Sequence, residues 1–590
     1  MASLPGAFFE KGRSFLPCLF NSFDPYFKQP FGAVRAGQSV HLSLCIPEEL
    51  GYVDPHLVLQ KEGRYDVPVH YRMKFDGQTP HQNHFSVDVT LNDVGLYFYY
   101  FDLYTNFRRI VRGPDNCGVV SWQEGESWQI TVYEADFETP APIKGKVFYQ
   151  IFPDRFCEGV ENKPMPFPDR LYQADKHAEP FWQPNEVGGH LNEDYFGGDL
   201  KGVQMKLPYL REMGVDYLYL NPIFEAHSNH RYNTADYLNV DPLLGTNEDF
   251  ETLCAEARKY GIGIVLDGVF SHTGSDSRYF NREGRYGEGG AYRDPNSPYR
   301  SWYDFDSKYK GGYRSWWGFE TLPEVNEETP SYVEFITGEG GVIDTWLRRG
   351  AAGFRLDVAD ELPDDFIADI RAAMEQEKPD SILLGEVWED ASNKVSYGAL
   401  REYFLGSELD ATMHYPFRTA VLDFLQGKIN AQTACDTFWT IQEHYPKENL
   451  YAALNLIGSH DRARVLTVLG GDMNALKMAM FLQFALPGVP SIYYGDEAGM
   501  TGGTDPYNRG SFPWGKGNAP LTDFVRSLTA MYQETPLLRR GECEMLFFGE
   551  NVLGCRRFDE SGSVLALVNR GEEAVECFGV TVPGREYILE

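Results

Sequence analysis

The chain has 590 residues, and its formal net charge at neutral pH is −33. That length exceeds a single hydrophobic core and predicts several domains, while the acidic balance argues against nucleic acid and anionic membranes as partners, since both bind clustered cations. The 9 cysteines are scattered without a CxxC pair, so neither a zinc ribbon nor a disulfide framework is indicated.

The start of the chain lacks a basic segment followed by an apolar core, so we expect no signal peptide. The longest apolar stretch, residues 476–494, contains Lys477, Gln483, Pro487 and Pro490. These residues favour a buried helix followed by a buried strand over a membrane span. The expected compartment is a reducing cytoplasm.

Residues 1–138 are expected to form a β-sandwich of the carbohydrate-binding type. Alternating apolar runs occur at residues 39–46, 84–91 and 96–104, and Phe75-Asp76-Gly77 is a turn signal between two of them. The runs are short and separated by turn residues, which is typical of an all-β domain.

The pattern changes after a Thr-Pro-Ala-Pro linker, and residues 139–540 alternate near-continuous apolar runs with helix-period segments. The strand-like runs are 147–152, 216–221, 262–270, 353–357, 382–387, 410–415, 451–457 and 489–494. The helix-like segments include 247–259, 363–375, 476–486 and 520–535. This alternation predicts an α/β fold with a (β/α)8 TIM barrel, and a doubly wound sheet is the alternative that it leaves open.

Two segments depart from this pattern. Residues 273–332 are rich in Gly, Tyr, Arg and Trp and have little periodicity, which predicts a long functional loop, or B domain, after the third strand. The tail, residues 541–590, becomes strand-like again and predicts a small C-terminal β domain.

Polar residues lie at or just beyond the C-terminal ends of four of the apolar runs. At the C-terminal ends of barrel strands such residues point into the active site. The residues at these positions are Asp267, His272, Arg355, Asp357, Glu386, His460 and Asp461. We therefore predict that these acids, histidines and arginine gather at one mouth of the barrel.

This set suits the cleavage of glycosidic bonds, which uses one carboxylic acid as proton donor and one carboxylate at the anomeric carbon. Asp357 and Glu386 follow adjacent parallel strands, about 4.8 Å apart. Their carboxyl groups can therefore approach the separation of a retaining mechanism, about 5–5.5 Å. Arg355 precedes Asp357 on the same strand face and is expected to hold that aspartate ionised.

Four segments resemble, in order and spacing, the signature regions of the α-amylase family, glycoside hydrolase family thirteen: GIVLDGVFSH, GFRLDVAD, LLGEVWED and LIGSHD. Further segments, at residues 197–202, 230–237, 322–326 and 494–497, resemble the neopullulanase, cyclomaltodextrinase and amylopullulanase branch. That branch carries an additional N-terminal β-sandwich. The resemblance covers most of residues 145–535.

The resemblance implies roles for individual residues. Asp357 would be the nucleophile, Glu386 the general acid/base and Asp461 the transition-state stabiliser. The remaining substrate-binding residues would be Tyr232, Asp267, His272, Arg355, Trp388, His460 and Arg509. Structural support is the alternative role for Asp267. For Trp316 and Trp317, sugar stacking and packing within the long loop stay open.

We therefore expect a retaining glycoside hydrolase that acts through a covalent glucosyl-enzyme intermediate. Its substrates would be α-1,4 bonds, with α-1,6 bonds as a further candidate, in malto-oligosaccharides, pullulan, cyclodextrins or starch-derived dextrins. A transglycosylase using the same site is the alternative, since only the acceptor differs. A non-catalytic relative, like the heavy subunits of amino-acid transporters, is disfavoured because the carboxylates are present.

No cofactor is expected to be required, and no metal ligands are predicted. Many α-amylases have an asparagine that binds calcium before the histidine of the first region, and the residue here is Ser271, a poor calcium ligand. The related branch often dimerises through the N-terminal domain, so a homodimer is a further expectation.

Overall fold

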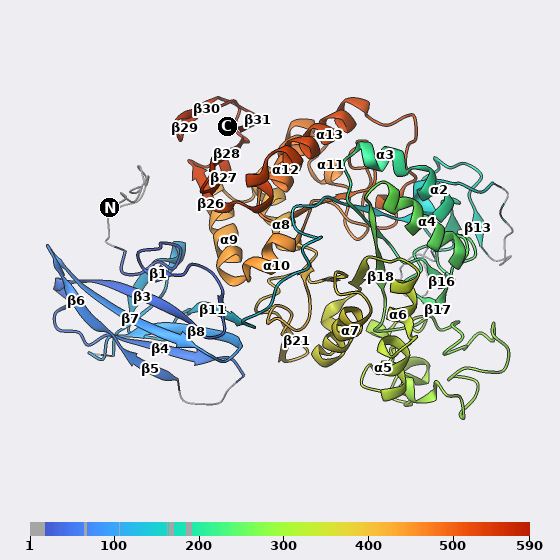
Figure 1. Ribbon diagram of the computed structural model, residues 1–590, viewed down its shortest axis with the longest axis horizontal. Helices are drawn as coiled ribbons and strands as arrows, with labels where there is room; N and C mark the ends of the chain where they lie inside the picture. Colours follow the sequence, from blue (N-terminus) through green and yellow to red (C-terminus); the bar gives the residue numbers. More distant parts are fainter. Residues whose placement is uncertain (1–17, 64–67, 106, 162, 164–169, 184–191) are drawn as a thin grey trace. The chain divides into compact units, whose positions relative to one another are not determined.

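The structure is a computed structural model that describes residues 18–63, 68–105, 107–161, 163, 170–183 and 192–590. The chain divides into two compact units, Met1–Ala135 and Asp136–Glu590 (Figure 1). No helix in these described ranges is long and apolar enough to cross a membrane.

The N-terminal unit is built from two sheets around one core. The first sheet has the order β1 (Lys28–Gln29), β3 (Gln38–Pro47), β7 (Gln82–Leu91), β6 (Lys74–Thr79). The second has the order β10 (Gly118–Ser121), β9 (Arg109–Arg112), β8 (Gly95–Asp102), β11 (Trp128–Tyr133), β2 (Val34–Arg35), with β4 (His56–Lys61) beside β8 and β5 (Val69–Arg72) beside β4. Leu42 and Leu44 of one sheet share a buried core with Tyr99 and Trp128 of the other, so the predicted all-β sandwich is confirmed.

The turn predicted at residues 75–77 is wrong. Phe75 and Gly77 both belong to β6, and the pairing with β7 shifts register between them. Gly77 has a φ of 142°, a backbone conformation open to glycine, and it absorbs this bulge. The chain reverses further on, between Thr79 and Gln82.

The second unit contains an eight-stranded parallel sheet in the order β23-β20-β19-β18-β15-β12-β25-β24. Its strands are β12 (Phe148–Ile151), β15 (Tyr217–Leu220), β18 (Gly263–Gly268), β19 (Gly353–Leu356), β20 (Ile382–Gly385), β23 (Ala411–Thr412), β24 (Leu454–Leu456) and β25 (Val489–Tyr493). A parallel bridge between Met413 and Leu454 joins the two end strands. The predicted barrel is thereby confirmed, and the doubly wound alternative is wrong.

Side chains alternate between the two faces of these strands, as the period of two requires. Tyr219, Val265 and Leu384 belong to a cluster inside the barrel. Their neighbours, such as Leu218 and Leu266, belong to a cluster shared with the surrounding helices. Asp267 and Glu386 lie two residues after Val265 and Leu384, so the same alternation places their side chains on the inner face of the barrel.

All eight strands are shorter than the predicted runs, and in two cases a helix takes part of the run. The run 451–457 begins as helix α10 (Lys447–Ala452), and only Leu454–Leu456 form β24. In the run 410–415, Tyr415 already opens helix α8 (Tyr415–Leu425), which has a proline in its first turn. A proline near the N-terminus favours a helix start, and Pro446 precedes α10 in the same way.

The predicted helices are confirmed as α4 (Asn247–Lys259), α7 (Asp364–Glu377), α12 (Met473–Ala485) and α13 (Ala519–Glu534). At the start of α4, Thr246 and Asp249 form a reciprocal capping box. The other helices of this unit are α1 (Pro153–Phe156), α2 (Leu200–Met205), α3 (Leu207–Glu212), α5 (Pro330–Thr337), α6 (Val342–Arg348), α9 (Ala431–His444), α11 (Val465–Val468) and α14 (Pro536–Arg540).

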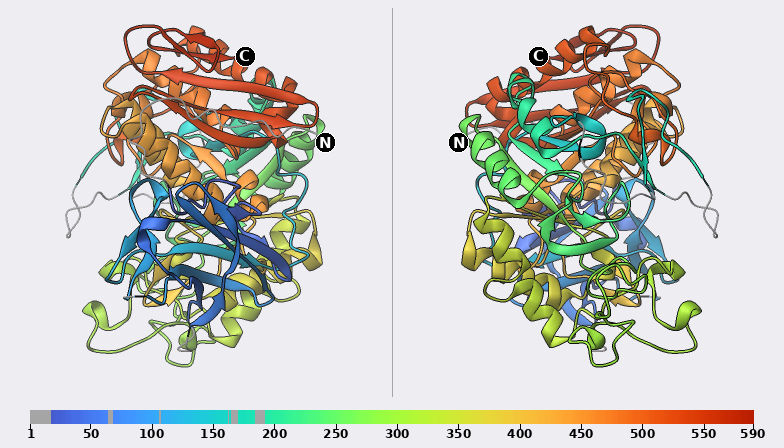
Figure 2. Two further views of the ribbon diagram at one scale, coloured as in Figure 1. Left: turned by 90° about the vertical axis from the view of Figure 1, so that its left-hand side faces the viewer. Right: turned by 90° about the vertical axis from the view of Figure 1, so that its right-hand side faces the viewer.

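The C-terminal strands and the long loop complete the second unit and lie at opposite ends of it (Figure 2). The C-terminal sheet has the order β26 (Glu542–Phe548), β27 (Val552–Asp559), β28 (Gly562–Asn569), β31 (Glu586–Leu589), beside a hairpin of β29 (Val575–Cys577) and β30 (Val580–Val582). Its Tyr587 stacks on Phe481 of α12 with ring centroids 4.5 Å apart. The loop is tied to the barrel by a bridge between His272 and Glu324.

Candidate active site

One buried guanidinium connects three carboxylates at the ends of adjacent strands. Asp267 lies opposite Arg355 in the pairing of β18 with β19. Arg355 Nη1 lies 2.7 Å from Asp267 Oδ1 and 2.9 Å from Asp357 Oδ1, and its Nη2 lies 2.8 Å from Glu386 Oε2. Arg355 is fully buried, so these charges offset one another in a site with little water.

Glu386 receives two further hydrogen bonds from neutral donors. The backbone N–H of Val358 donates to Oε2 at 2.9 Å, and the indole N–H of Trp388 donates to Oε1 at 3.0 Å. Val358 has φ 39° and ψ 59°, a left-handed conformation that is rare for a β-branched residue. The backbone after Asp357 is therefore strained, and it points an amide at the neighbouring carboxylate.

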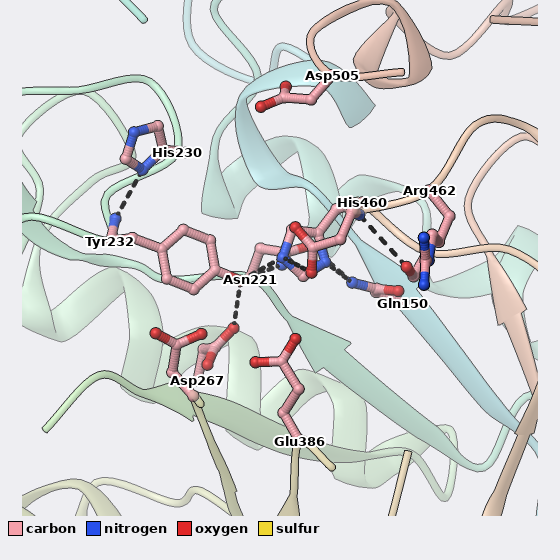
Figure 3. Close-up of polar contacts among 12 residues, drawn as sticks. Gln150, Asn221, His230, Tyr232, Asp267, Glu386, His460, Arg462 and Asp505 are labelled. Atoms are coloured by element: carbon pink, nitrogen blue, oxygen red, sulfur yellow. Dashed lines mark hydrogen bonds and ion pairs between the residues drawn. The ribbon is translucent and has the colours of Figure 1, made fainter. Parts of the chain in front are cut away.

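A chain of hydrogen bonds fixes Tyr232 above Asp267 (Figure 3). The Tyr232 hydroxyl donates to Asp267 Oδ2 at 2.8 Å and accepts from the Asn221 amide at 2.9 Å. It also lies 2.6 Å from His460 Nε2, and the two rings stack at 5.4 Å. Because Gln150 donates to His460 Nδ1 at 2.8 Å, the ring proton belongs on Nε2 and points at Tyr232.

His460 also connects this chain to Asp461 and Arg509. Its Nε2 lies 3.1 Å from Asp461 Oδ2, and Arg509 Nη2 lies 3.4 Å from Asp461 Oδ1. A second carboxylate, Asp505, lies 2.8 Å from Arg509 Nη1. Arg509 thus holds Asp461 at the edge of the site.

Three contacts with aromatic rings complete the walls of the site. Trp388 stacks on Tyr415 with centroids 4.4 Å apart, and the Arg462 guanidinium lies over the Trp388 ring at 4.0 Å. His272 packs against Trp316, with ring centroids 5.4 Å apart.

Both ring nitrogens of His272 form hydrogen bonds with other groups of the protein. Nε2 lies 3.1 Å from the carbonyl oxygen of Tyr232, and Nδ1 lies 2.9 Å from Ser271 Oγ. Because the carbonyl only accepts, Nε2 carries the proton and the serine hydroxyl donates to Nδ1. Ser271 Oγ is therefore engaged by a histidine, and in the described residues no group of three or more His, Cys, Asp or Glu side chains is arranged to hold a metal ion.

Burial dominates the electrostatics of the site. It raises the pKa of Asp357 well above its ordinary value, with Arg355 opposing this shift and Glu386 adding to it. Burial also raises the pKa of Asp267, opposed by Arg355, and of Asp461, opposed by Arg509. The two histidines respond in the opposite sense: burial lowers the pKa of His272 to about 4 and that of His460 well below its usual range. Both histidines are neutral at physiological pH.

The structure joins all the site residues predicted from sequence into one network of contacts. The sequence did not single out several residues that contact them, among them Gln150, Tyr219, Asn221 and Val358. Gln150 and Asn221 are polar residues inside or at the end of apolar strand runs, a signal that could have identified them. Tyr219 donates to Asp267 Oδ2 at 2.7 Å but looks like a core residue in the sequence, and the strain at Val358 has no sequence signal.

A parallel barrel with paired carboxylates at the C-terminal ends of adjacent strands is the architecture of many glycoside hydrolases. Residues 150–518 match the family model described as "Alpha amylase, catalytic domain", which is more than half of the chain. The chain belongs to the α-amylase family of glycoside hydrolases.

Several similar proteins carry the names of α-glucan hydrolases. The amylopullulanase of Thermoanaerobacter thermohydrosulfuricus is 34% identical over 94% of this chain and 42% of its own length. The cyclomaltodextrinase of Geobacillus thermopakistaniensis is 34% identical over 75% of this chain and 71% of its own. A solved structure of a cyclic α-maltosyl-(1→6)-maltose hydrolase from Arthrobacter globiformis is 30% identical, covers 76% of this chain and 99% of its own, and has a TM-score of 0.68. The chain spans less than half the length of the amylopullulanases that it matches.

Proposed function

We propose that this chain hydrolyses α-glucosidic bonds with retention of the anomeric configuration. One observation carries the proposal: a single guanidinium, that of Arg355, lies 2.9 Å from Asp357 and 2.8 Å from Glu386. Two carboxylates that share one cation are close enough to act on the same bond from its two sides. Such proximity favours direct attack over the insertion of a water molecule.

Asp357 acts as the nucleophile and Glu386 as the general acid. Asp357 Oδ attacks the anomeric carbon while the Glu386 proton passes to the glycosidic oxygen, and the leaving chain departs as an alcohol. Water then attacks the covalent glucosyl ester, and Glu386 takes the water proton. Two inversions at one carbon give net retention.

The other network residues support this reaction. Asp461, held by Arg509, stabilises the positive charge that develops on the sugar. Tyr232 offers its ring beside the sugar, and Asp267 is proposed to orient Tyr232 and Arg355 through its hydrogen bonds. Neutral His272 and His460 are proposed to position Tyr232, because His272 contacts its carbonyl oxygen and His460 contacts its hydroxyl group.

The names of the relatives support the choice of substrate. They include amylopullulanase, cyclomaltodextrinase and a hydrolase of cyclic α-maltosyl-(1→6)-maltose. We propose α-1,4 and α-1,6 glucosidic bonds in malto-oligosaccharides, pullulan, cyclodextrins or dextrins as substrates. We also propose that no calcium ion binds at the position beside His272, because the Ser271 hydroxyl is hydrogen-bonded to His272. Dimerisation and a cytoplasmic location stay predictions from the sequence.

The decisive experiment compares Asp357→Asn and Glu386→Gln with Glu389→Gln. Each of the first two is expected to lower kcat on maltotriose and pullulan by several orders of magnitude. Glu389 lies only three residues from Glu386, but its side chain is 62% exposed, so its variant should match the wild type. NMR of the first products should show the α-anomer. Near-normal rates in either site variant would overturn the assignment, and a β-anomer would overturn retention alone.

Transglycosylation is the second candidate because a sugar hydroxyl can replace water in the second step. Product analysis across a range of maltotriose concentrations separates the two. Products longer than the substrate would indicate transfer, and glucose and maltose alone would indicate hydrolysis.

A further inference from the structure

Two aromatic side chains of the barrel unit are far more exposed than its other apolar groups. Trp317 and Tyr397 are each 75% exposed, which makes them the most exposed large hydrophobic side chains in the described part of residues 136–590. An exposed ring of this size costs free energy in water, so a pair of them at one place points to a ligand that covers them. Core packing, the alternative considered for Trp317, is excluded by this exposure.

Both rings are held by one carboxylate. The Trp317 indole N–H donates to Glu361 Oε1 at 3.1 Å, and the Tyr397 hydroxyl donates to Glu361 Oε2 at 2.6 Å. Each oxygen of Glu361 thus fixes the polar end of one aromatic side chain. The two rings are therefore oriented in the absence of any bound molecule, which lowers the entropic cost of binding one.

The backbone at both aromatic positions is strained. Trp317 has a φ of 51° and Tyr397 a φ of 50°. Bulky residues rarely adopt this left-handed conformation, and strain of this kind clusters at binding sites, where the surrounding structure maintains it. Three independent features, namely exposure, a shared carboxylate and backbone strain, coincide at these two residues.

The three residues come from loops at the catalytic end of the barrel. Trp317 lies in the long loop after β18, Glu361 follows β19, and Tyr397 lies between β21 (Val395–Ser396) and β22 (Ala399–Leu400), which follow β20. The strands β18, β19 and β20 are neighbours in the barrel sheet. Glu361 lies four residues after Asp357 in the chain.

A chain of ring contacts connects this position with the candidate active site. Trp317 contacts Trp316 with ring centroids 5.8 Å apart. Trp316 in turn packs against His272 at 5.4 Å. The exposed pair is therefore an extension of the site rather than a separate surface.

We propose that Trp317, Glu361 and Tyr397 form a sugar-binding platform that holds glucose units of an α-glucan away from the bond being cleaved. The apolar C–H face of a glucose ring packs on a flat aromatic ring, while its hydroxyls bond to polar groups at the edge, here Glu361. This inference rests on the proposed function and adds to it a preference for longer chains. Short substrates that end before the platform gain nothing from it.

The test compares maltoheptaose with maltotriose in the full chain. Trp317→Ala and Tyr397→Ala should each lower the ratio of kcat/KM for maltoheptaose to that for maltotriose about tenfold, the effect of losing one aromatic contact. Trp317→Phe should recover most of that ratio because it keeps a stacking face. Tyr260→Ala is the matched control: Tyr260 is also exposed, but it lies between α4 and β18, at the opposite end of the barrel.

Binding provides a second measurement that does not need turnover. Calorimetric titration of maltoheptaose into the Asp357→Asn variant should show about tenfold weaker binding when Trp317→Ala or Tyr397→Ala is added. Unchanged ratios and unchanged binding in both alanine variants would overturn the platform, even if the wild type cleaves both sugars. If the wild type cleaves neither sugar, the proposed function fails, and the titration still decides for or against the platform.

Discussion

His272 should make the barrel less stable as the solution becomes acidic. In the folded chain burial lowers its pKa from 6.5 to about 4. The unfolded chain therefore binds a proton between these two values while the folded chain does not. Because the unfolded state binds more protons in this range, the free energy of unfolding rises with pH. The stability that neutral His272 contributes is therefore complete above pH 6.5 and is lost as the pH falls toward 4.

The size of this effect follows from the pKa difference. A shift from 6.5 to about 4 corresponds to about 3 kcal/mol of unfolding free energy. Burial explains the sign, because His272 is 2% exposed and its protonated ring would lose most of the hydration that it has in the unfolded chain.

The assay is urea unfolding of the full chain at a series of pH values, for the wild type and for His272→Gln. The difference in unfolding free energy between them should grow by about 3 kcal/mol from pH 4 to pH 6.5. His177→Gln changes an exposed histidine and serves as control, with a difference that stays constant. A constant difference for His272→Gln as well would refute the argument.

Three further predictions concern a buried acid, a buried arginine and the effect of chelation. Glu497 accepts hydrogen bonds from Tyr149 at 2.5 Å and Tyr209 at 2.8 Å, and burial raises its pKa from 4.5 to about 7. As the pH rises from 4.5 to about 7, the unfolding free energy of the wild type should therefore fall by about 3 kcal/mol relative to that of Glu497→Gln. A difference in unfolding free energy that does not change with pH in urea titrations would contradict this. Arg355→Lys keeps the charge, but one ammonium cannot replace the guanidinium on three carboxylates, so kcat/KM should fall at least a hundredfold, whereas a fall of less than tenfold would show that charge alone suffices. Extensive chelation should leave activity and Tm unchanged because Ser271 is a poor calcium ligand, and a loss that Ca²⁺ restores would show a metal site.

Much of the fold could be predicted because the barrel strands are buried on both faces. Residues such as Val265 and Leu384 belong to apolar runs whose length and spacing are visible in the sequence. The errors fell where local chemistry competes with this pattern. Tyr451 belongs to an apolar run that is typical of a strand, but it lies in helix α10, which begins directly after Pro446.

The candidate site was predictable to the extent that it lies at strand ends. Asp267, Asp357 and Glu386 each lie at or near the end of a buried run, and parallel strands bring their C-terminal ends to one mouth. The sequence by itself therefore determined which carboxylates meet, since alternation and strand order leave few other arrangements.

Only the tertiary structure decided which partners these carboxylates have. The contacts of Arg355 depend on the register between β18, β19 and β20, which no single segment specifies. The left-handed backbone of Val358 and the pairing of Trp317 with Tyr397 through Glu361 arise in loops without periodicity. Their geometry is set by packing between segments far apart in the chain, and so a pattern within one segment cannot reveal it.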